Sequence, residues 1–347
     1  MIRPRIPMRL AIVMAASLAT LAGLTTPYKL SAAEPFYQNK TITVISYAGP
    51  SGGYTFFARL FARHLPKHME GSPNAIVKNM VGAGGLTATR YLYEAAPRDG
   101  TVIGTISRGI PFEPLLGQDK VSFDPLQFNW IGSMSSAVTI FIGWHTASVK
   151  TARDLFEREL MIAGTGAGAD SEVIPGILNR LFGTKFKVIS GYKDVTEASL
   201  AMERGEVEGM YWGWASLKNN YAHWLQDKKV NVLLQARFTP FPEIADVPLV
   251  TTLARNERER QIVDLLFARE LLGHPMLAPP AVPTAQVAAL RRAFEASYAD
   301  PALVAEAEKS KMHLELTKGE EIAATIRRTY AIPQEVIRQV TDALGRH

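Results

Sequence analysis

Apolar and polar positions follow two periods along the chain, one typical of strands and one typical of helices. Residues 41–47 form a β-branched, apolar run, and the apolar positions of 56–65 then recur at helical spacing. A second strand and helix follow at 75–80 and 86–95, and another strand at 101–106. Alternation of this kind predicts parallel strands joined by crossover helices.

The same rhythm starts again after Thr151. Two β-rich runs, 128–132 and 138–144, precede it, and the pattern is helical from Thr284 to the end. We therefore predict an α/β fold of two αβ units in series, with mixed, mostly parallel sheets flanked by helices. The strands expected in the second unit are 160–163, 186–190, 207–212 and 230–235, and its helices are 171–182 and 195–204.

The first 33 residues read as an export signal. A basic start at Arg3, Arg5 and Arg9 precedes an apolar run, and Ser31-Ala32-Ala33 supplies the small residues of a cleavage site. The run at 10–24 is shorter than the roughly 20 apolar residues of a spanning helix, so we expect cleavage after Ala33 rather than an anchor. The mature chain, 34–347, is then periplasmic, and its length favours two domains.

Charge and cysteine content narrow the function classes. The leader holds four positive charges and no acid, so its removal lowers the formal net charge from +5 to about +1. A nearly neutral chain without a basic stripe predicts no nucleic-acid partner. The absence of cysteine excludes thiol nucleophiles, thiolate zinc sites and iron-sulfur clusters. We expect no cofactor, no metal and a monomer.

Three glycine-rich bends carry the candidate binding chemistry. They span 49–53, 82–85 and 164–168, each after a predicted strand and before a predicted helix. Ligands gather at the carboxyl edge of parallel strands, where the next helix offers free N–H groups with about half a positive charge. Backbone amides and hydroxyls there suit a small anion without an arginine clamp. The candidate hydroxyls are Ser51, Thr55, Thr165 and Ser171.

Other interpretations of these residues stay open. A single bend of this kind is more often only a tight turn than a binding site. Residues 164–169 with Asp194 also weakly fit a dinucleotide fingerprint. His64 and His68 have a chelating spacing, although packing or solvation explains them better. Trp212 either lines a ligand crevice or packs in the core. Local catalytic signatures are absent, so an enzyme would have to assemble its site from distant residues.

With their neighbours, the bends resemble the periplasmic solute receptors of tripartite tricarboxylate transporters, the Bug or TctC-like family. Pro50-Ser51-Gly52-Gly53 with Ala58-Arg59 is similar to that family's P-G-G-x-x-D-x-x-A-R opening. The remaining motifs that follow the family's order are 79–85, 96–100, 123–125, 150–151, 165–168, 191–193, 246–248 and 278–283. The resemblance thus spans nearly the whole mature chain.

The resemblance implies a two-domain Venus-flytrap receptor, type II-like, without catalytic activity. Such a receptor captures a small carboxylate between its domains and delivers it to a two-subunit membrane permease. It implies domain 1 at 34–143 plus 273–347 and domain 2 at 144–272, with hinges near 143–146 and 271–274. It also implies anion capture by Ser51, Gly52, Gly53, Gly84 and Gly85, and closure contacts from Thr165, Gly168 and Ser171.

This chain departs from the family pattern at four places in or beside the bends, one of which is that Asp170-Ser171 follows Gly168-Ala169 where the family commonly has a Ser sooner. Thr55 stands in place of the usual loop Asp, Ser51 in place of a glycine, and Val81 in place of the proline. Without this Asp, the first loop tolerates anions better, or it contacts an amine of the ligand in a different way. The identity of the carboxylate stays open. The alternatives from other classes are a periplasmic α/β enzyme acting on a carboxylate or phosphorylated substrate and a receptor that signals through a membrane kinase.

Overall fold

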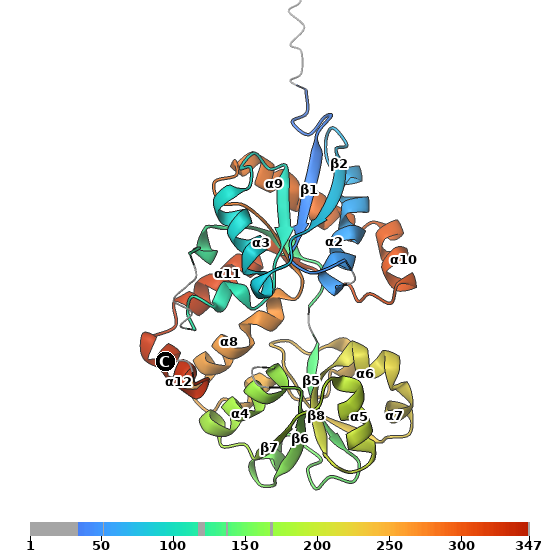
Figure 1. Ribbon diagram of the computed structural model, residues 1–347, viewed down its shortest axis with the longest axis vertical. Coiled ribbons are helices and arrows are strands. Elements are labelled where there is room, and N and C mark those ends of the chain that lie inside the picture. The colour runs from blue at the N-terminus through green and yellow to red at the C-terminus, as the bar shows by residue number, and fades with distance from the viewer. Residues whose placement is uncertain (1–33, 51, 117–121, 137, 167–168, 346–347) are drawn as a thin grey trace, which may run out of the picture. The chain divides into compact units, whose positions relative to one another are not determined.

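Two β-sheets with flanking helices carry the fold (Figure 1). This architecture is seen in a computed structural model, which describes residues 34–50, 52–116, 122–136, 138–166 and 169–345. The predicted α/β class with mixed, mostly parallel sheets is confirmed. The predicted export signal at 1–33 lies outside the described residues.

Six strands form the first sheet: β1 (Thr41–Ser46), β2 (Asn74–Asn79), β3 (Val102–Thr105), β4 (Asn129–Ser133), β10 (Pro275–Ala278) and β11 (Thr317–Lys318). Their order is β11-β4-β10-β3-β1-β2. β1 pairs in parallel with β2 and β3, β10 runs antiparallel to β3 and β4, and β11 runs antiparallel to β4. The loops after β1, β2, β3 and β4, and the residue before β10, therefore share one edge.

Five strands form the second sheet: β5 (Thr139–Trp144), β6 (Leu160–Gly164), β7 (Phe186–Ser190), β8 (Gly209–Gly213) and β9 (Val230–Gln235). Their order is β7-β6-β8-β5-β9, with β6 parallel to β7 and β8, and β5 antiparallel to β8 and β9. The carboxyl ends of β6 and β8 and the start of β5 thus share an edge. The consecutive β-rich runs at 128–132 and 138–144 belong to different sheets.

The helices cover both faces of each sheet. Residues of α2 (Gly53–His64) and α9 (Thr284–Tyr298) pack on one face of the first sheet, and residues of α3 (Leu86–Arg90) and α11 (Gly319–Tyr330) on the other. α10 (Pro301–Lys309) packs against α2 and α9. The remaining helices are α4 (Asp170–Phe182), α5 (Val195–Glu203), α6 (Trp214–Asn220), α7 (Ala222–Gln226), α8 (Glu257–Leu272) and α12 (Gln334–Ala343).

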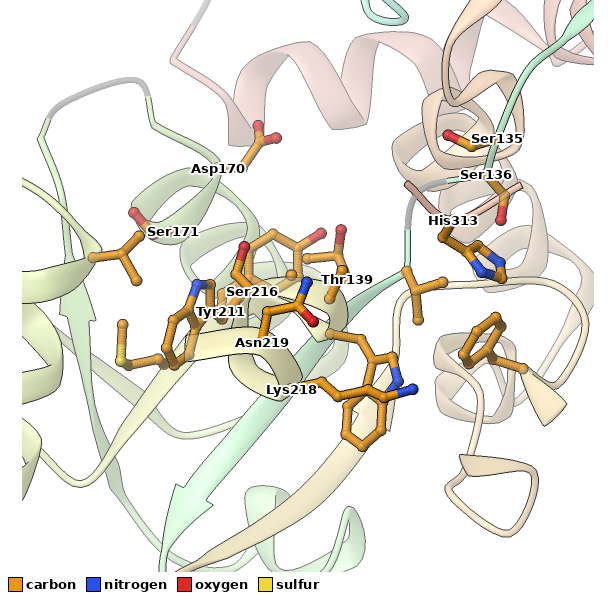
Figure 2. Close-up of a pocket in the computed structure, with 18 of the residues that line it drawn as sticks. Ser135, Ser136, Thr139, Asp170, Ser171, Tyr211, Ser216, Lys218, Asn219 and His313 are labelled. Atoms are coloured by element: carbon orange, nitrogen blue, oxygen red, sulfur yellow. The ribbon is translucent and has the colours of Figure 1, made fainter. Parts of the chain in front are cut away.

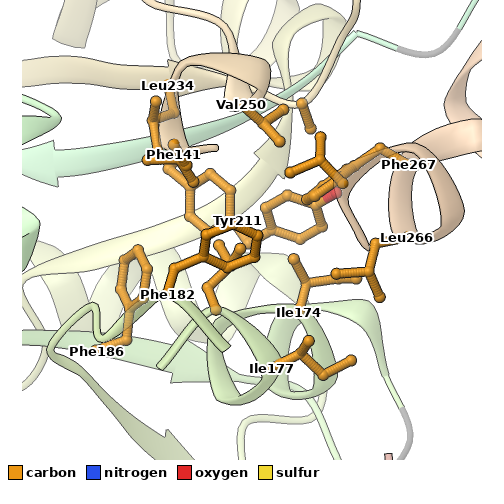
Figure 3. Close-up of a cluster of buried hydrophobic side chains, with 14 of the residues drawn as sticks. Phe141, Ile174, Ile177, Phe182, Phe186, Tyr211, Leu234, Val250, Leu266 and Phe267 are labelled. Carbon is orange, nitrogen blue, oxygen red and sulfur yellow. The ribbon is translucent and has the colours of Figure 1, made fainter. Parts of the chain in front are cut away.

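Alternation along the strands divides each sheet's side chains between two cores. Successive side chains of a strand point to opposite faces. In β1, Val44 therefore faces the core under α2, whereas Ile45 faces the core with α3 and α11. In β5, Phe141 joins a cluster with α4, α8 and α12, shown in Figure 3. Its neighbour Ile142 joins the opposite cluster, with α5 and the aromatic residues of α6 and α7.

The C-terminal helix departs from the prediction that everything after 273 rejoins the first sheet. α12 contacts α4 and α8 (Figure 1). Its apolar residues Val336, Ile337 and Val340 are buried in the cluster that contains Phe141 of the second sheet. A stripe of three apolar side chains at helical spacing needs an apolar partner, and this cluster provides it.

The predicted domain boundary at Gly143 falls within β5, whose residues from Thr139 onward pair with β8. A division between the sheets must therefore come before Thr139. By its contacts, Tyr37–His347 is one compact unit. The division into 34–143 plus 273–347 and 144–272 stays a prediction.

Candidate functional site

A pocket of about 800 Å3 lies where the carboxyl edges of the two sheets supply residues to one space (Figure 2). The first sheet's edge contributes Ser135 and His274, and the second contributes Thr139 from β5 and Thr165 after β6. Its volume falls within the roughly 300 to 1,000 Å3 typical of small-molecule sites.

An ion pair with a buried carboxylate and a partly exposed guanidinium stands in the wall formed by the loop after β3. Nη2 of Arg108 lies 3.2 Å from Oε1 of Glu270 on α8, and the hydroxyl of Thr139 donates to Oε2 of Glu270 at 3.1 Å. Desolvation raises the pKa of the buried Glu270 carboxyl, and Arg108 partly offsets this. Desolvation lowers and Glu270 raises the pKa of Arg108, with a net increase. Arg108 therefore presents a permanent positive charge to the pocket.

His274 is the second polar group of this wall. Its Nδ1 lies 2.7 Å from Oγ of the buried Ser135, and its ring packs against Tyr54 and Phe57 at 4.4 and 4.3 Å between centroids. Desolvation, and then the charge of Arg108, lower the pKa of His274 to about 3. The imidazole is therefore neutral near pH 7 and offers one donor and one acceptor.

Aromatic side chains form the wall contributed by β8 and α6. Tyr211, Trp212 and Trp214 are buried residues that line the pocket. The Trp214 indole N–H donates to Oε2 of Glu243 at 2.9 Å, and Lys218 Nζ lies 2.7 and 2.8 Å from the two oxygens of Glu243. Among the described residues, the Tyr211 hydroxyl is buried without a hydrogen-bond partner.

The bend before α4 is hydrogen-bonded within itself. The Thr165 N–H donates to Oγ of Ser171 at 3.1 Å, and the Gly166 N–H donates to Oε1 of Glu172 at 2.9 Å. Asp170, also in the first turn, lies 3.3 Å from Nη1 of Arg269. Acidic side chains therefore already meet the positive end of this helix. Thr165 and Ser171 still line the pocket, joined by a 2.9 Å bond between their hydroxyls.

The two glycine bends of the first sheet lie outside the lining of this pocket. Gly53, which begins α2, comes nearest, because a β-carbon there would lie 3.8 Å from Nε2 of His274. Gly52 is half-buried and precedes that helix. Gly84 is exposed, with φ of 64°, and Gly85 is buried against the Tyr47 ring.

Thr55 is fully buried, with its hydroxyl committed to the protein. Its Oγ1 lies 2.8 Å from Oγ of Ser46, donates to the Ala48 carbonyl at 3.1 Å, and accepts from Asn79 Nδ2 at 2.8 Å. These bonds tie α2 to the ends of β1 and β2. The structure therefore brings Thr165, Ser171 and Trp212 together and keeps Thr55 apart from them. The predicted residues Ser51 and Gly168 lie outside the described residues.

Arg108, Ser135, His274, Ser216 and Asn219 also line the pocket, and the sequence reasoning passed over them. Three of them had a usable signal, because Arg108 follows a predicted strand and Ser216 and Asn219 follow another. The edge rule was applied only where glycines marked the loop. His274 lies at this edge because β10 pairs between β3 and β4. The local sequence does not predict that pairing.

In the described ranges, no group of three His, Asp or Glu side chains is placed to hold a metal ion. His64 instead contacts two acids at the α2–α10 contact, with Nε2 2.8 Å from Oε2 of Glu306 and Nδ1 3.5 Å from Oδ2 of Asp300. His68 lies 3.3 Å from the same Asp300 oxygen. The pair packs against α10.

Solved structures share this architecture along their whole length. A TctC solute-binding protein from Polaromonas superposes with a TM-score of 0.69 at 18% identity, over 87% of this chain and 99% of that one. The chain has the TctC solute-receptor fold. The periplasmic binding protein BugD gives 0.56 at 19% identity, over 88% and 98%. MatC from Rhodopseudomonas palustris, with bound malate, gives 0.53 at 19%, over 86% and 99%.

At identities this low the likeness shows a shared fold and nothing more. No family model matches the sequence, and no curated protein matches it. Within the described residues, no helix combines the length and the apolar character needed to cross a bilayer. The TctC-like fold predicted from the glycine motifs is thereby confirmed by structure rather than by sequence similarity.

Proposed function

We propose that the protein is a periplasmic solute receptor that captures a small carboxylate in this pocket and delivers it to a two-subunit permease of the tripartite tricarboxylate type. The permanent charge of Arg108 inside a pocket of largely apolar lining carries the proposal. Malate in MatC, a protein of the same fold, supports a carboxylate as the ligand class. The export signal predicted at residues 1–33 supports a periplasmic location for the mature chain.

The anion would meet Arg108 first and uncharged hydrogen-bonding groups second. Nη2 of Arg108 contacts Glu270, and the guanidinium of this lining residue has five N–H donors, more than that contact uses. Neutral His274 and the hydroxyls of Thr165 and Ser171 add hydrogen bonds that carry no net charge. Gly53, beside His274, is the member of the first glycine bend best placed to add a backbone contact. A charge-assisted hydrogen bond contributes roughly 1.5 to 3 kcal/mol, so Arg108 is the expected anchor.

Catalysis is the alternative that a specific contact favours. Ser135 and His274 lie 2.7 Å apart, which is the spacing of a nucleophile and its base. However, Nε2 of His274 has no carboxylate partner among the described residues, and a pKa of about 3 makes the imidazole a poor base near pH 7. Both features support binding without turnover.

Delivery to a permease requires an unliganded and a liganded arrangement that the permease can distinguish. We propose that the ligand bridges groups of the two sheets, Arg108 and His274 on one side and Thr165 and Ser171 on the other, and so favours the closed pair of domains. Two segments join the sheets here, one between β4 and β5 and one from β9 through α8 to β10. The domain division follows these segments, with its first boundary before Thr139.

The test is thermal unfolding of the mature chain in a panel of carboxylates that includes malate. A ligand at one hundred times its dissociation constant adds about 2.7 kcal/mol to the stability. Arg108→Gln alone leaves Glu270 buried without its partner, so the informative variant is Arg108→Gln with Glu270→Gln. It should fold and lose the ligand-induced shift, whereas Arg153→Gln, an exposed control, should keep it. A hit that stabilises the double variant as much as the wild type would refute this pocket.

A further inference from the structure

The segment 312–316 contacts both sheets beside the pocket. It follows α10 and leads into β11, which pairs with β4 of the first sheet. Its side chains alternate in direction, as they do along a strand. The even-numbered ones pack on the core under α2: Met312, Leu314 and Leu316. His313 and Glu315 instead contact residues that follow β9 of the second sheet.

A bidentate ion pair fixes the second-sheet side of this segment. Nη1 and Nη2 of Arg237 lie 3.1 and 2.6 Å from Oε2 and Oε1 of Glu315. The side chain of Arg237 is 7% exposed and that of Glu315 is 34% exposed. Desolvation raises the pKa of Glu315, but hydrogen bonding to neighbouring side chains outweighs it and leaves the pKa well below its usual value. Both groups are therefore charged near pH 7, and paired contacts of this kind are strong.

Ser136 brings the connection between β4 and β5 into the same contact. Nη1 of Arg237 donates to Oγ of Ser136 at 2.7 Å, and that hydroxyl donates to Glu315. Ser136 lies in one of the two segments that join the sheets, and Arg237 lies in the other, two residues after β9. The ion pair therefore ties both joining segments to 312–316 of the first sheet's side.

The same contacts hold two side chains of the pocket wall. The Arg237 guanidinium lies over the Phe241 ring, 5.4 Å from its centroid, and Phe241 meets the His313 ring edge-on at 5.0 Å. Ser136, Phe241 and His313 line the pocket (Figure 2). Arg237 and Glu315 lie outside the described lining, so they can act on a ligand only through this wall.

We infer that Arg237 and Glu315 are positioning residues that hold the two sheets in the arrangement that forms the pocket. Their ion pair joins the sheets through groups of the protein alone, so it does not depend on a ligand. An apparent dissociation constant is the intrinsic one divided by the fraction of binding-competent molecules, and the ion pair keeps that fraction high. The effect on affinity rests on the proposed receptor function, whereas the effect on the arrangement of the sheets does not.

Distances between two spin labels in the protein without ligand test the arrangement directly. The chain has no cysteine, so Lys78→Cys on β2 and Lys187→Cys on β7, exposed positions of different sheets, are the only labelling sites. Arg237→Gln with Glu315→Gln removes both charges without leaving one of them buried alone. This double variant should broaden the distance distribution, because the sheets then sample other arrangements.

Two further variants make the result decisive. Arg153→Gln with Glu157→Gln removes an exposed ion pair within the second-sheet part of the chain and should leave the distribution unchanged. If the double variant at Arg237 and Glu315 fails to fold, Arg237→Lys replaces it. Lysine keeps the charge but cannot form the bidentate contact, so it should still broaden the distribution. A distribution as narrow as that of the labelled parent would overturn the inference.

Titration calorimetry measures the effect on affinity. The probes are malate and every other carboxylate of the thermal-unfolding panel that binds the wild type. Arg237→Gln with Glu315→Gln should weaken all of them by the same factor, about tenfold, because neither residue belongs to the described lining. A loss confined to one ligand would overturn the inference, since the variant would then have altered the pocket wall itself. If no carboxylate binds while the distance distribution broadens, the proposed ligand class fails and the positioning role stands.

Discussion

At the scale of single residues, the first sheet's wall of the pocket combines a permanent cation with a histidine kept neutral. Arg108 and His274 are neighbours electrostatically, and the guanidinium helps to hold the imidazole pKa at about 3. Burial contributes more to this shift than Arg108 does. The result is an imidazole that stays uncharged between pH 5 and 8. Ligand binding there is therefore insulated from protonation of His274.

The neutral state of His274 costs stability in acid. Above pH 6.5, the usual histidine pKa, the residue is neutral in both the folded and the unfolded chain. As the pH falls from 6.5 towards 3, the unfolded chain takes up a proton that the folded chain refuses, so stability is lost. At pH 5 the loss amounts to about 2 kcal/mol. Urea unfolding of His274→Gln at pH 8 and pH 5 should show that much less loss than the wild type.

A matched control is His145→Gln, which replaces an exposed histidine outside the pocket. It should keep the acid sensitivity of the wild type. An unchanged pH dependence in His274→Gln would mean that the imidazole is protonated within the fold, and the neutral state assigned to His274 would be wrong.

At the scale of elements, the junction between α8 and β10 sets the geometry of the site. Gly273 ends α8 with φ of 50° and ψ of −107°, and His274 follows it directly. A β-carbon at Gly273 would overlap the backbone of Ser135. The Gly273 carbonyl accepts a 3.0 Å hydrogen bond from the Tyr54 hydroxyl, whose oxygen accepts the Arg108 N–H at 3.3 Å. Gly273 thus positions His274, which follows it, and is linked to Arg108 through the Tyr54 hydroxyl.

Gly273→Ala should therefore destabilise the protein by at least about 2 kcal/mol, through backbone strain and overlap. Gly176→Ala is the contrasting variant, since that glycine lies within α4 with open space around it. It should stabilise by about 1 kcal/mol, the helix preference of alanine over glycine. Chemical unfolding of both variants measures the difference. Equal effects from the two substitutions would show that the junction tolerates a side chain.

The elements also show why the sequence predicted some features and not others. Strands followed by helices leave two distinct periods, so β1, α2, β6 and α4 were readable from local pattern. β11, with only two residues, leaves no period to detect. β10 reads as a strand, but its place between β3 and β4 comes from packing of segments far apart in the sequence. Thr165, Ser171 and Trp212, which the sequence suggested, accordingly line the pocket from the end of β6, from α4 and from β8, whereas Arg108 and His274 line it without having been suggested.

At the scale of the whole molecule, α8 connects the packing of the two sheets, and α12 packs on α8. Residues 262–267 of α8 lie in the cluster with Phe141, whereas Ala268 and Leu272 lie in the cluster with Ile45 of β1. α12 then covers α8 and α4. A helix shared by two cores couples their unfolding, because neither core can lose it alone. This sharing supports one cooperative unit in 37–347 despite two separate sheets.

Weakening α12 should lower the stability of the entire chain in one step. Ile337→Ala removes a buried side chain from the cluster with Phe141 and should cost about 2 to 4 kcal/mol. Arg338→Ala, on the exposed side of the same helix, should cost less than about 0.5 kcal/mol. Calorimetry of both variants should show a single transition, shifted to lower temperature only for Ile337→Ala. If that variant instead shows two transitions, each sheet unfolds on its own, and α8 and α12 lie between two independent cores without coupling them.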